Sequence, residues 1–376
     1  MPAASVYLDH NATSPLRPEA FDAMVEALKT GGNPSAVHAV GRKARGVVDR
    51  ARRQVAARVG ALPAEVIFTS GGTEANNMAL AGSGRKRVLI SSIEHESVQR
   101  AVPEAEVVPV DGEGVLELAA LERKLAASDE PALVSVMFAN NETGVLQPMA
   151  DIVRIARKAG ALVHCDAVQA AGKVPVDLHG IGIDYLSLAA HKLGGPTGVG
   201  ALIVRADAPF ASNRFGGGQE TNRRAGTENL SGIVGFGAAA EAASGLASAL
   251  RDQGEAALLA IAPKARVFGS GAKRLPNTTY ISMPGVPAET QVMALDLAGV
   301  CVSAGSACSS GKVHRSAVLA AMGIEDAEAG LAIRISFGWN SQSDDIDRLI
   351  AAWRDLYIRV GKSDIPNARG LVISRG

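Results

Sequence analysis

Residues 70–77 read Ser-Gly-Gly-Thr-Glu-Ala-Asn-Asn and stand between a short apolar run at 66–68 and a helical pattern. Glycines let the backbone turn tightly, and the N–H groups and dipole at the start of a helix can hold a phosphate group. No Gly-Lys-Ser/Thr sequence follows, so these residues are not the phosphate loop of nucleotide-hydrolysing enzymes. An ordinary capped turn between a strand and a helix fits them equally well.

Apolar runs of strand length recur on either side of this turn. They occupy residues 66–68, 88–90, 133–138, 162–163 and 186–188, with helix-like stretches or loops between them. A helix is predicted from about residue 42, because apolar residues from Val47 to Val59 recur on one helical face. This alternation predicts an α/β fold with a mostly parallel central sheet flanked by helices. It also places ligands at the carboxyl ends of the strands.

The alternation of strand and helix patterns changes after a long Ala-rich helical stretch near residues 229–250. The rest of the chain predicts strands at 279–283, 300–304 and 331–336, a helix at about 288–298, and a closing helix capped at Ser343. A chain of 376 residues is too long for one simple core, so this change indicates a second, smaller α+β domain. We expect a large domain at 16–255 and a small domain made of 1–15 and 256–376.

The composition argues against a nucleic-acid or membrane partner. Lys plus Arg and Asp plus Glu both number 38, so the chain has no excess charge of one sign. We find no apolar run long enough to span a bilayer and no targeting segment at the N-terminus. The three cysteines, Cys165, Cys301 and Cys308, are too few for a disulfide framework or paired metal ligands. We therefore expect a cytoplasmic protein, with Cys165 and Cys301 buried in strands.

Two chemically useful residues stand where strands are predicted to end. Asp166 closes a buried strand, where an acid needs a partner such as a pyridinium nitrogen, although many such residues are only caps. His164, Cys165 and Asp166 make a poor metal site, because alternate side chains of a strand point to opposite faces. Lys192 enters a glycine-rich loop and could form a Schiff base, although most lysines are solvated. The order of turn, acid and lysine in one α/β domain favours the chemical interpretation.

Many short segments match one known family in family order. They are residues 8–15, 32–35, 70–77, 94–97, 140–144, 164–169, 191–192, 224–229, 303–309 and 334–338. By these segments the chain resembles the cysteine desulfurases of the class V aminotransferase group, which are fold-type I enzymes that use pyridoxal 5'-phosphate (PLP). Residues 309–315 are similar to the branch with a longer cysteine loop, which serves iron–sulfur cluster assembly. Ala317 stands where that branch often has histidine.

The resemblance implies a role for each matching residue around the PLP ring. Lys192 would hold the cofactor as a Schiff base, Asp166 would pair with the ring nitrogen, and Gln169 would bond to the ring oxygen. His95 would stack on the ring and move protons, while a stacked but inert His95 stays an alternative.

The resemblance also assigns the residues that bind the phosphate group and the substrate. Gly72, Thr73 and His191 would hold the phosphate, together with Thr227 from the other subunit of a homodimer. The substrate, L-cysteine, would be bound by three further residues. These are Asn33, Asn141 and Arg334, of which Arg334 would pair with the α-carboxylate.

Cys308 lies in a segment of small residues, 303–311, that suits a mobile loop better than a packed core. The resemblance implies that Lys192 helps to remove the α-proton and that the Cys308 thiolate attacks the substrate's sulfur. Alanine would leave and a persulfide would stay on Cys308. The loop could carry that sulfur to an acceptor protein such as an iron–sulfur scaffold, where Cys308 could transiently contact a cluster. We expect no resident metal.

The chain departs from the family at Ala189, where a serine usually donates to the cofactor phosphate. Losing a hydrogen bond to a charged group costs about 1.5–3 kcal/mol, so we expect weaker PLP retention. Three alternative functions stay open. They are a selenocysteine lyase, another class V lyase or aminotransferase, and an inactive PLP-fold scaffold.

Overall fold

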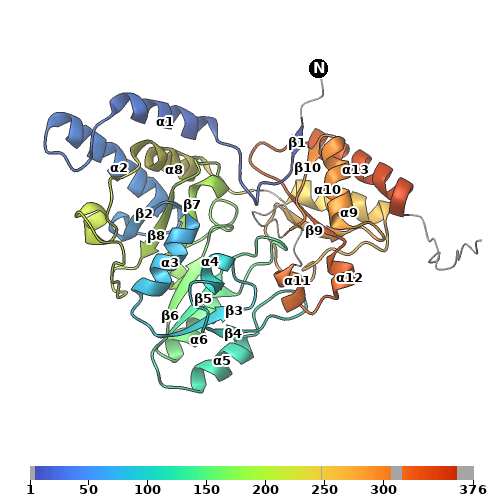
Figure 1. Ribbon diagram of the computed structural model, residues 1–376, viewed down its shortest axis with the longest axis horizontal. Helices are drawn as coiled ribbons and strands as arrows, with labels where there is room; N and C mark the ends of the chain where they lie inside the picture. The colour runs from blue at the N-terminus through green and yellow to red at the C-terminus, as the bar shows by residue number, and fades with distance from the viewer. Residues whose placement is uncertain (1–4, 247, 306–315, 362–376) are drawn as a thin grey trace, which may run out of the picture.

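The computed structural model describes residues 5–246, 248–305 and 316–361. Its larger part is built on a seven-stranded sheet with strand order β2-β8-β7-β6-β5-β3-β4 (Figure 1). The strands are β2 (Val66–Thr69), β3 (Arg87–Ser91), β4 (Glu106–Val108), β5 (Ala132–Met137), β6 (Leu162–Asp166), β7 (Tyr185–Ala189) and β8 (Gly200–Val204). Neighbouring strands are parallel except where β8 pairs with β2 and β7. The predicted α/β fold with a mostly parallel sheet is confirmed.

Helices cover both faces of this sheet. They are α1 (Pro18–Thr30), α2 (Ala39–Arg58), α3 (Gly72–Gly82), α4 (Glu96–Gln99), α5 (Leu118–Ala126), α6 (Met149–Lys158), α7 (Leu178–Ile181) and α8 (Leu230–Ala242). Side chains alternate along a strand, so Val134 and Leu186 pack with α2, α6 and α8, while Leu133 and Tyr185 pack with α3. Three short turns complete this part. They are the 3₁₀ helices η1 (Pro63–Glu65) and η2 (Ala190–Lys192), and the turn η3 (Gln219–Asn222).

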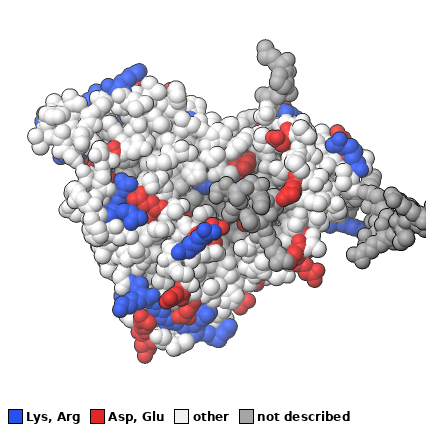
Figure 2. Space-filling view, in the orientation of Figure 1, with Lys and Arg blue, Asp and Glu red and all other residues white. Residues whose placement is uncertain are grey.

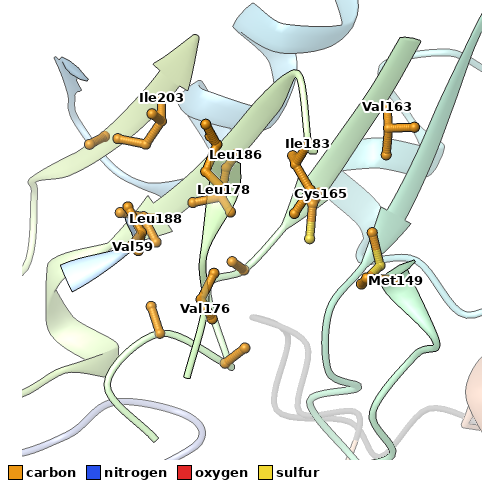
Figure 3. Close-up of a cluster of buried hydrophobic side chains, with 14 of the residues drawn as sticks. Val59, Met149, Val163, Cys165, Val176, Leu178, Ile183, Leu186, Leu188 and Ile203 are labelled. Carbon is orange, nitrogen blue, oxygen red and sulfur yellow. The ribbon is translucent and has the colours of Figure 1, made fainter. Parts of the chain in front are cut away.

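The face covered by α2 and α6 carries the largest apolar cluster. Figure 3 shows Cys165 of β6 and Leu186 of β7 lying together with Ile203 of β8 and Met149 of α6. Cys165 is fully buried, as predicted, and burial raises the pKa of its thiol well above the usual value. A thiol held neutral in this way is a core residue and not a nucleophile.

A second group of elements lies beside the large sheet, at the right in Figure 1. It contains two small sheets, in which β1 (Val6–Tyr7) pairs with β10 (Val300–Cys301) and β9 (Thr278–Ser282) pairs with β11 (Ala332–Ser336). Its helices are α9 (Ala249–Ile261), α10 (Ala288–Leu297), α11 (Ala317–Ala321), α12 (Asp326–Ala329) and α13 (Ser343–Leu356), followed by the π-helical turn η4 (Tyr357–Gly361). Leu258, Ile281, Leu295, Ile333 and Trp353 form its apolar core. The division of the chain into two domains stays a prediction, and the expected boundary at 255 falls inside α9.

The structure differs from the sequence predictions in three places. The helical stretch near 229–250 is two helices, because α8 ends at Ala242 and α9, which begins at Ala249, contributes to the second core. The closing helix is capped by Gln342 and not by Ser343, since the Gln342 N–H donates to Asp345 Oδ2 at 2.8 Å. Cys301 is half-buried in β10 and not fully buried, because β10 lies in a two-stranded sheet.

The described residues include no helix that could span a membrane, and one face of the molecule carries charges of both signs. Within residues 5–246, 248–305 and 316–361, every helix is too short or too polar to cross a bilayer. On the face drawn in Figure 2, basic and acidic side chains lie among each other. This arrangement agrees with the equal numbers of acidic and basic residues in the sequence.

The turn η3 holds three successive residues in the left-handed region of backbone conformation. The φ angles of Glu220, Thr221 and Asn222 are 46°, 56° and 63°, and each such residue other than glycine costs roughly 1 kcal/mol. The buried Glu220 carboxylate stabilises this turn, because it accepts hydrogen bonds from Arg52 Nη1 and Nη2 at 2.7 and 2.8 Å and from Phe68 N at 2.9 Å. One carboxylate therefore joins the turn to α2 and β2.

We predict that Glu220→Gln destabilises the chain by about 3 kcal/mol, because the amide leaves the mostly buried Arg52 guanidinium without a counter-charge. Urea unfolding followed by circular dichroism measures this change. The matched control is Glu26→Gln, which breaks an exposed pair with Lys29 of 2.7 Å and should leave the free energy of unfolding almost unchanged. Equal losses in the two variants would show that Glu220 does not stabilise the strained turn.

Candidate active site

The loops that follow the strands of the large sheet bring most of the predicted site residues to one edge. Gly72 follows β2, His95 follows β3, Asn141 follows β5, Asp166 ends β6, and Lys192 follows β7. These five strands run in the same direction, so their carboxyl ends meet at that edge. The sequence analysis predicted that ligands bind at these carboxyl ends, and the predicted site residues lie there.

Asp166 is a buried carboxylate that accepts two hydrogen bonds from its own chain. Val168 N donates to Oδ1 at 2.9 Å and Asn76 Nδ2 donates to Oδ2 at 2.8 Å. In the described part of the chain, no cationic side chain forms an ion pair with Asp166. A carboxylate has about four acceptor positions, so Asp166 can accept from a further, charged donor.

His95 is joined to Asp166 through two polar side chains that the sequence analysis did not assign. Ser97 N donates to His95 Nδ1 at 3.1 Å, and Asn76 Nδ2 donates to Ser97 Oγ at 2.9 Å. The Ser97 hydroxyl then faces His95 Nδ1 at 2.8 Å. Because Nδ1 accepts from Ser97 N, a neutral His95 in this network carries its proton on Nε2. Asn76 and Ser97 lie in quoted segments, but only the fold shows that they touch.

Lys192 reaches from η2 to the N-terminal segment of the chain. Its Nζ donates to the backbone oxygens of Asn11 and Ala12, at 2.5 and 2.7 Å. Burial and the charge of Arg334 lower the pKa of Lys192 from 10.5 to about 8, while Asp9 and Asp166 oppose this shift. The amine is therefore partly neutral near physiological pH, which is the form that attacks a carbonyl group.

The residues beside Lys192 are held through the same segment. Gln169 Nε2 donates to the Asn11 backbone oxygen at 2.9 Å. His191 Nδ1 lies 3.2 Å from Thr13 Oγ1, and burial with the charges of Lys192 and Lys173 lowers the pKa of His191 to about 4. A neutral imidazole can still donate one hydrogen bond to a phosphate oxygen.

Arg334 lies in β11 and points its guanidinium group towards the edge of the large sheet. It donates to Asp9 Oδ1 at 2.6 Å and to the backbone oxygen of Asn141 at 3.1 Å. The side chain is only 4% exposed, and its Nε has no hydrogen-bond partner in the described part of the chain. An unsatisfied donor on a buried guanidinium suits an additional anionic ligand.

Gly72 begins α3 and is packed too closely for a larger residue. A Cβ atom at Gly72 would lie 2.7 Å from Val168 Cγ2 and 3.6 Å from the Cβ of Ala189. Thr73 is exposed in the first turn of the same helix. Ala189, where the family usually has serine, thus lies against the turn expected to hold the phosphate.

Two predicted site residues lie away from this group, and a third is not described by the structure. Asn33 lies in the exposed loop between α1 and α2, at the far left in Figure 1, and its Oδ1 accepts from Ser35 N at 2.8 Å. Thr227 is exposed and lines a cavity of about 110 Å³ with Ser70 and Gly198. Cys308 lies outside the described residues.

No cluster of three or more His, Cys, Asp or Glu side chains among the described residues could hold a metal ion. His164 lies between Ser135 Oγ and Ser187 Oγ, at 2.8 and 3.0 Å, and burial lowers its pKa to about 4. It is therefore a neutral, hydrogen-bonded core residue.

Comparison with known proteins gives one consistent family. The family model for class V aminotransferases matches residues 6–349. A cysteine desulfurase from Cereibacter sphaeroides is 45% identical over 364 residues, which cover 92% of this chain and 94% of that protein. A cysteine desulfurase from Sinorhizobium fredii is 41% identical over 367 residues, which cover 92% of this chain and 94% of that protein.

Solved structures agree with these relatives. A NifS-like protein from Rickettsia africae superposes with a TM-score of 0.86 at 33% identity, covering 94% of this chain and 99% of that one. The structure described as SspA in complex with cysteine gives a TM-score of 0.79 at 30% identity. The match covers 89% of this chain and 99% of that one.

We predict that Lys192 condenses with an added aromatic aldehyde at a rate that rises with a midpoint near pH 8. A deprotonated amine is required, and an ordinary lysine would still be gaining reactivity above pH 10. Borohydride trapping and peptide mapping measure the modified fraction at Lys192. Arg334→Met should move the midpoint to higher pH, because the charge of Arg334 lowers the pKa of Lys192. An unchanged midpoint in that variant would contradict this cause.

Proposed function

The chain belongs to the cysteine desulfurases of the class V aminotransferase family, and from this we propose that it takes sulfur from L-cysteine with the help of PLP. The products are L-alanine and a persulfide on Cys308. The observation that carries the proposal is the meeting of Lys192, Asp166 and Arg334 at one sheet edge. The charges of Arg334 and Asp166 both act on the pKa of Lys192.

The residues at this edge fit PLP. Asp166 offers free acceptor positions to a protonated ring nitrogen, and Gln169 carries an amide N–H suited to the ring oxygen. Gly72, Thr73 and His191 would hold the phosphate, and Lys192 would bind the cofactor covalently. When bound, PLP supplies an electron sink that makes the α-proton of an amino acid acidic.

The chain's own residues would position the substrate and move its proton. Arg334, with its unsatisfied Nε, binds the α-carboxylate. Asn141 is its neighbour, because the backbone oxygen of Asn141 accepts a hydrogen bond from Arg334 Nη1. The pKa of about 8 lets Lys192 take up a proton at Nζ near neutral pH. His95 offers Nε2 as a second site for proton transfer. A His95 that only stacks on the ring stays the alternative.

The residues that flank Cys308 support its role as the sulfur acceptor. Ser303, five positions before it, exchanges backbone hydrogen bonds with Arg334, at 3.1 and 2.6 Å. The part of the chain that precedes Cys308 by five positions is thus held beside the proposed carboxylate site. On the other side, Ser316 Oγ donates to the buried Glu142 Oε2 at 2.6 Å.

The chemical equation balances without a further oxidant. The Cys308 thiolate attacks Sγ of L-cysteine, the carbon–sulfur bond breaks, and the carbon receives a proton to give alanine. The persulfide keeps the transferred sulfur. We propose that an acceptor protein, such as an iron–sulfur scaffold, then removes this sulfur in the cytoplasm, with Cys308 transiently contacting the cluster.

We propose that the functional unit is a homodimer, because two predicted residues lie away from the site in one chain. A second copy is the arrangement in which Thr227 and Asn33 could complete a neighbouring site. Large apolar side chains exposed on the single chain support such an interface. They include Phe21, Leu28, Val37 and Phe215, of which Val37 and Phe215 are 85% and 89% exposed.

We predict that the PLP-loaded protein converts L-cysteine to alanine in the presence of a reductant and that Cys308→Ala abolishes this conversion. Amino-acid analysis of the reaction measures the alanine. Cys301→Ala, a half-buried thiol in β10, is the matched control and should keep full activity. Alanine formation by Cys308→Ala would show that Cys308 is not the nucleophile. PLP binding without any alanine would favour another lyase or aminotransferase, whereas a chain that binds no PLP would favour the scaffold alternative.

We predict a dimer of twice the chain mass of 38.6 kDa by light scattering, with PLP sites shared between subunits. Chains carrying Lys192→Ala and chains carrying Thr227→Ala should each bind PLP poorly. Co-expressed as mixed dimers, they should regain tight binding in one site of two, because that site combines an intact Lys192 with the partner's intact threonine. A stable, active monomer would contradict this arrangement, as would mixed dimers without recovery.

A further inference from the structure

Lys173 is a buried lysine at the site to which the sequence analysis gave no role. Its side chain is 5% exposed, and Nζ donates to Gln169 Oε1 and to Asn11 Oδ1, both at 2.7 Å. Buried lysines are rare, because removing an ammonium group from water is costly. A lysine kept here in place of an apolar residue therefore calls for an explanation at the site.

The contact with Lys173 decides which end of the Gln169 amide faces which neighbour. A lysine amine can only donate when charged and mainly donates when neutral, so the group that it meets must be Oε1. Gln169 Nε2 is then on the opposite side, where one N–H donates to the Asn11 backbone oxygen at 2.9 Å. The other N–H is left for a ligand, and it is the donor that an oxygen on the cofactor ring requires.

Asn11 is held independently of Lys173. Its Nδ2 donates to Thr278 Oγ1 at 2.9 Å and to the Asn141 backbone oxygen at 3.2 Å, and its Oδ1 also accepts from Asn277 Nδ2 at 3.2 Å. In the described part of the chain, Lys173 is the one donor to Gln169 Oε1. Loss of Lys173 therefore changes the orientation of Gln169 much more than that of Asn11.

The surroundings of Lys173 explain how a lysine is tolerated. Burial and the charges of Lys192 and Arg334 hold its pKa well below the usual value. A neutral amine still has two N–H groups, the number that Gln169 and Asn11 accept. Lys173 can thus orient the amide without adding a full positive charge beside Lys192.

We propose that Lys173 is a positioning residue for the cofactor, which acts by fixing the Gln169 amide so that Nε2, and not Oε1, faces the ring oxygen. This inference rests on the proposed function, since the ring oxygen belongs to PLP. Lys173 itself touches neither the cofactor nor the substrate. Its effect is carried by Gln169 alone, and this restriction makes the inference testable.

The test is a double-mutant cycle with Lys173→Met and Gln169→Ala, read out by titrating PLP into the PLP-free proteins and following the absorption of the bound cofactor. Lys173→Met alone should weaken PLP binding roughly tenfold, as expected for loss of a hydrogen bond to a charged group. In the Gln169→Ala background the same change should weaken binding less than about twofold. Lys173→Met and Gln169→Ala should also shift the absorption maximum in the same direction.

Two further variants separate orientation from general damage. Gln169→Glu keeps a partner for Lys173 but presents no N–H group, so it should bind PLP as poorly as Gln169→Ala. Gln291→Met removes two buried hydrogen bonds in the small part of the molecule, to Val286 O and Leu331 O at 2.8 and 2.7 Å. It should lower the melting temperature of the PLP-free chain without changing PLP affinity.

Several results would overturn the inference. Equal weakening by Lys173→Met in both backgrounds would make Lys173 a structural residue, and unchanged binding in Lys173→Met or in Gln169→Glu would remove its role. If Lys173→Met does not fold, unchanged PLP binding in Gln169→Glu still overturns the inference. A native chain that binds PLP but forms no alanine would contradict the desulfurase function without contradicting the role of Lys173. A native chain that binds no PLP would overturn both.

Discussion

The backbone oxygen of Asn11 is where the two parts of the molecule meet the reactive amine. It accepts hydrogen bonds from Lys192 Nζ and Gln169 Nε2, both carried by loops of the large sheet. The Asn11 N–H donates to Ser336 Oγ of β11 at 2.9 Å, and its side chain reaches Thr278 of β9. One residue of the N-terminal segment thus holds the small sheet against the strand-end loops. The geometry of the site depends on this constraint.

The site gathers three basic side chains in a buried place. Burial and the charge of Arg334 lower the pKa of both Lys192 and Lys173, while Asp9 and Asp166 are the nearby acids that oppose this effect at Lys192. A buried excess of positive charge favours anions, because there is little water to screen it. The proposed ligands, a phosphate and an amino-acid carboxylate, both carry the complementary charge. Binding strength and a reactive amine therefore have the same physical origin.

The regular part of the fold could be predicted from the sequence. Short apolar runs gave β2, β3 and β5 nearly to the residue, because buried parallel strands consist of such runs. The placement of Asp166 and Lys192 at strand ends followed from those runs. The strand β8 was missed, although it reads Gly-Ala-Leu-Ile-Val, since a short apolar run does not reveal an antiparallel pairing. The break between α8 and α9 was missed as well, because alanine favours a helix throughout that stretch.

The sequence by itself determined which reactive groups the chain carries and the order in which they follow the strands. It determined the family for the same reason, since many short segments in order are recognisable without a fold. Only the tertiary structure decided the protonation of Lys192, the unsatisfied Nε of Arg334 and the orientation of Gln169. These properties depend on burial and on contacts such as that between Lys173 and Asn11, which are 162 positions apart in the chain. Local sequence carries no signal for such a contact, because only the packing of distant segments creates it.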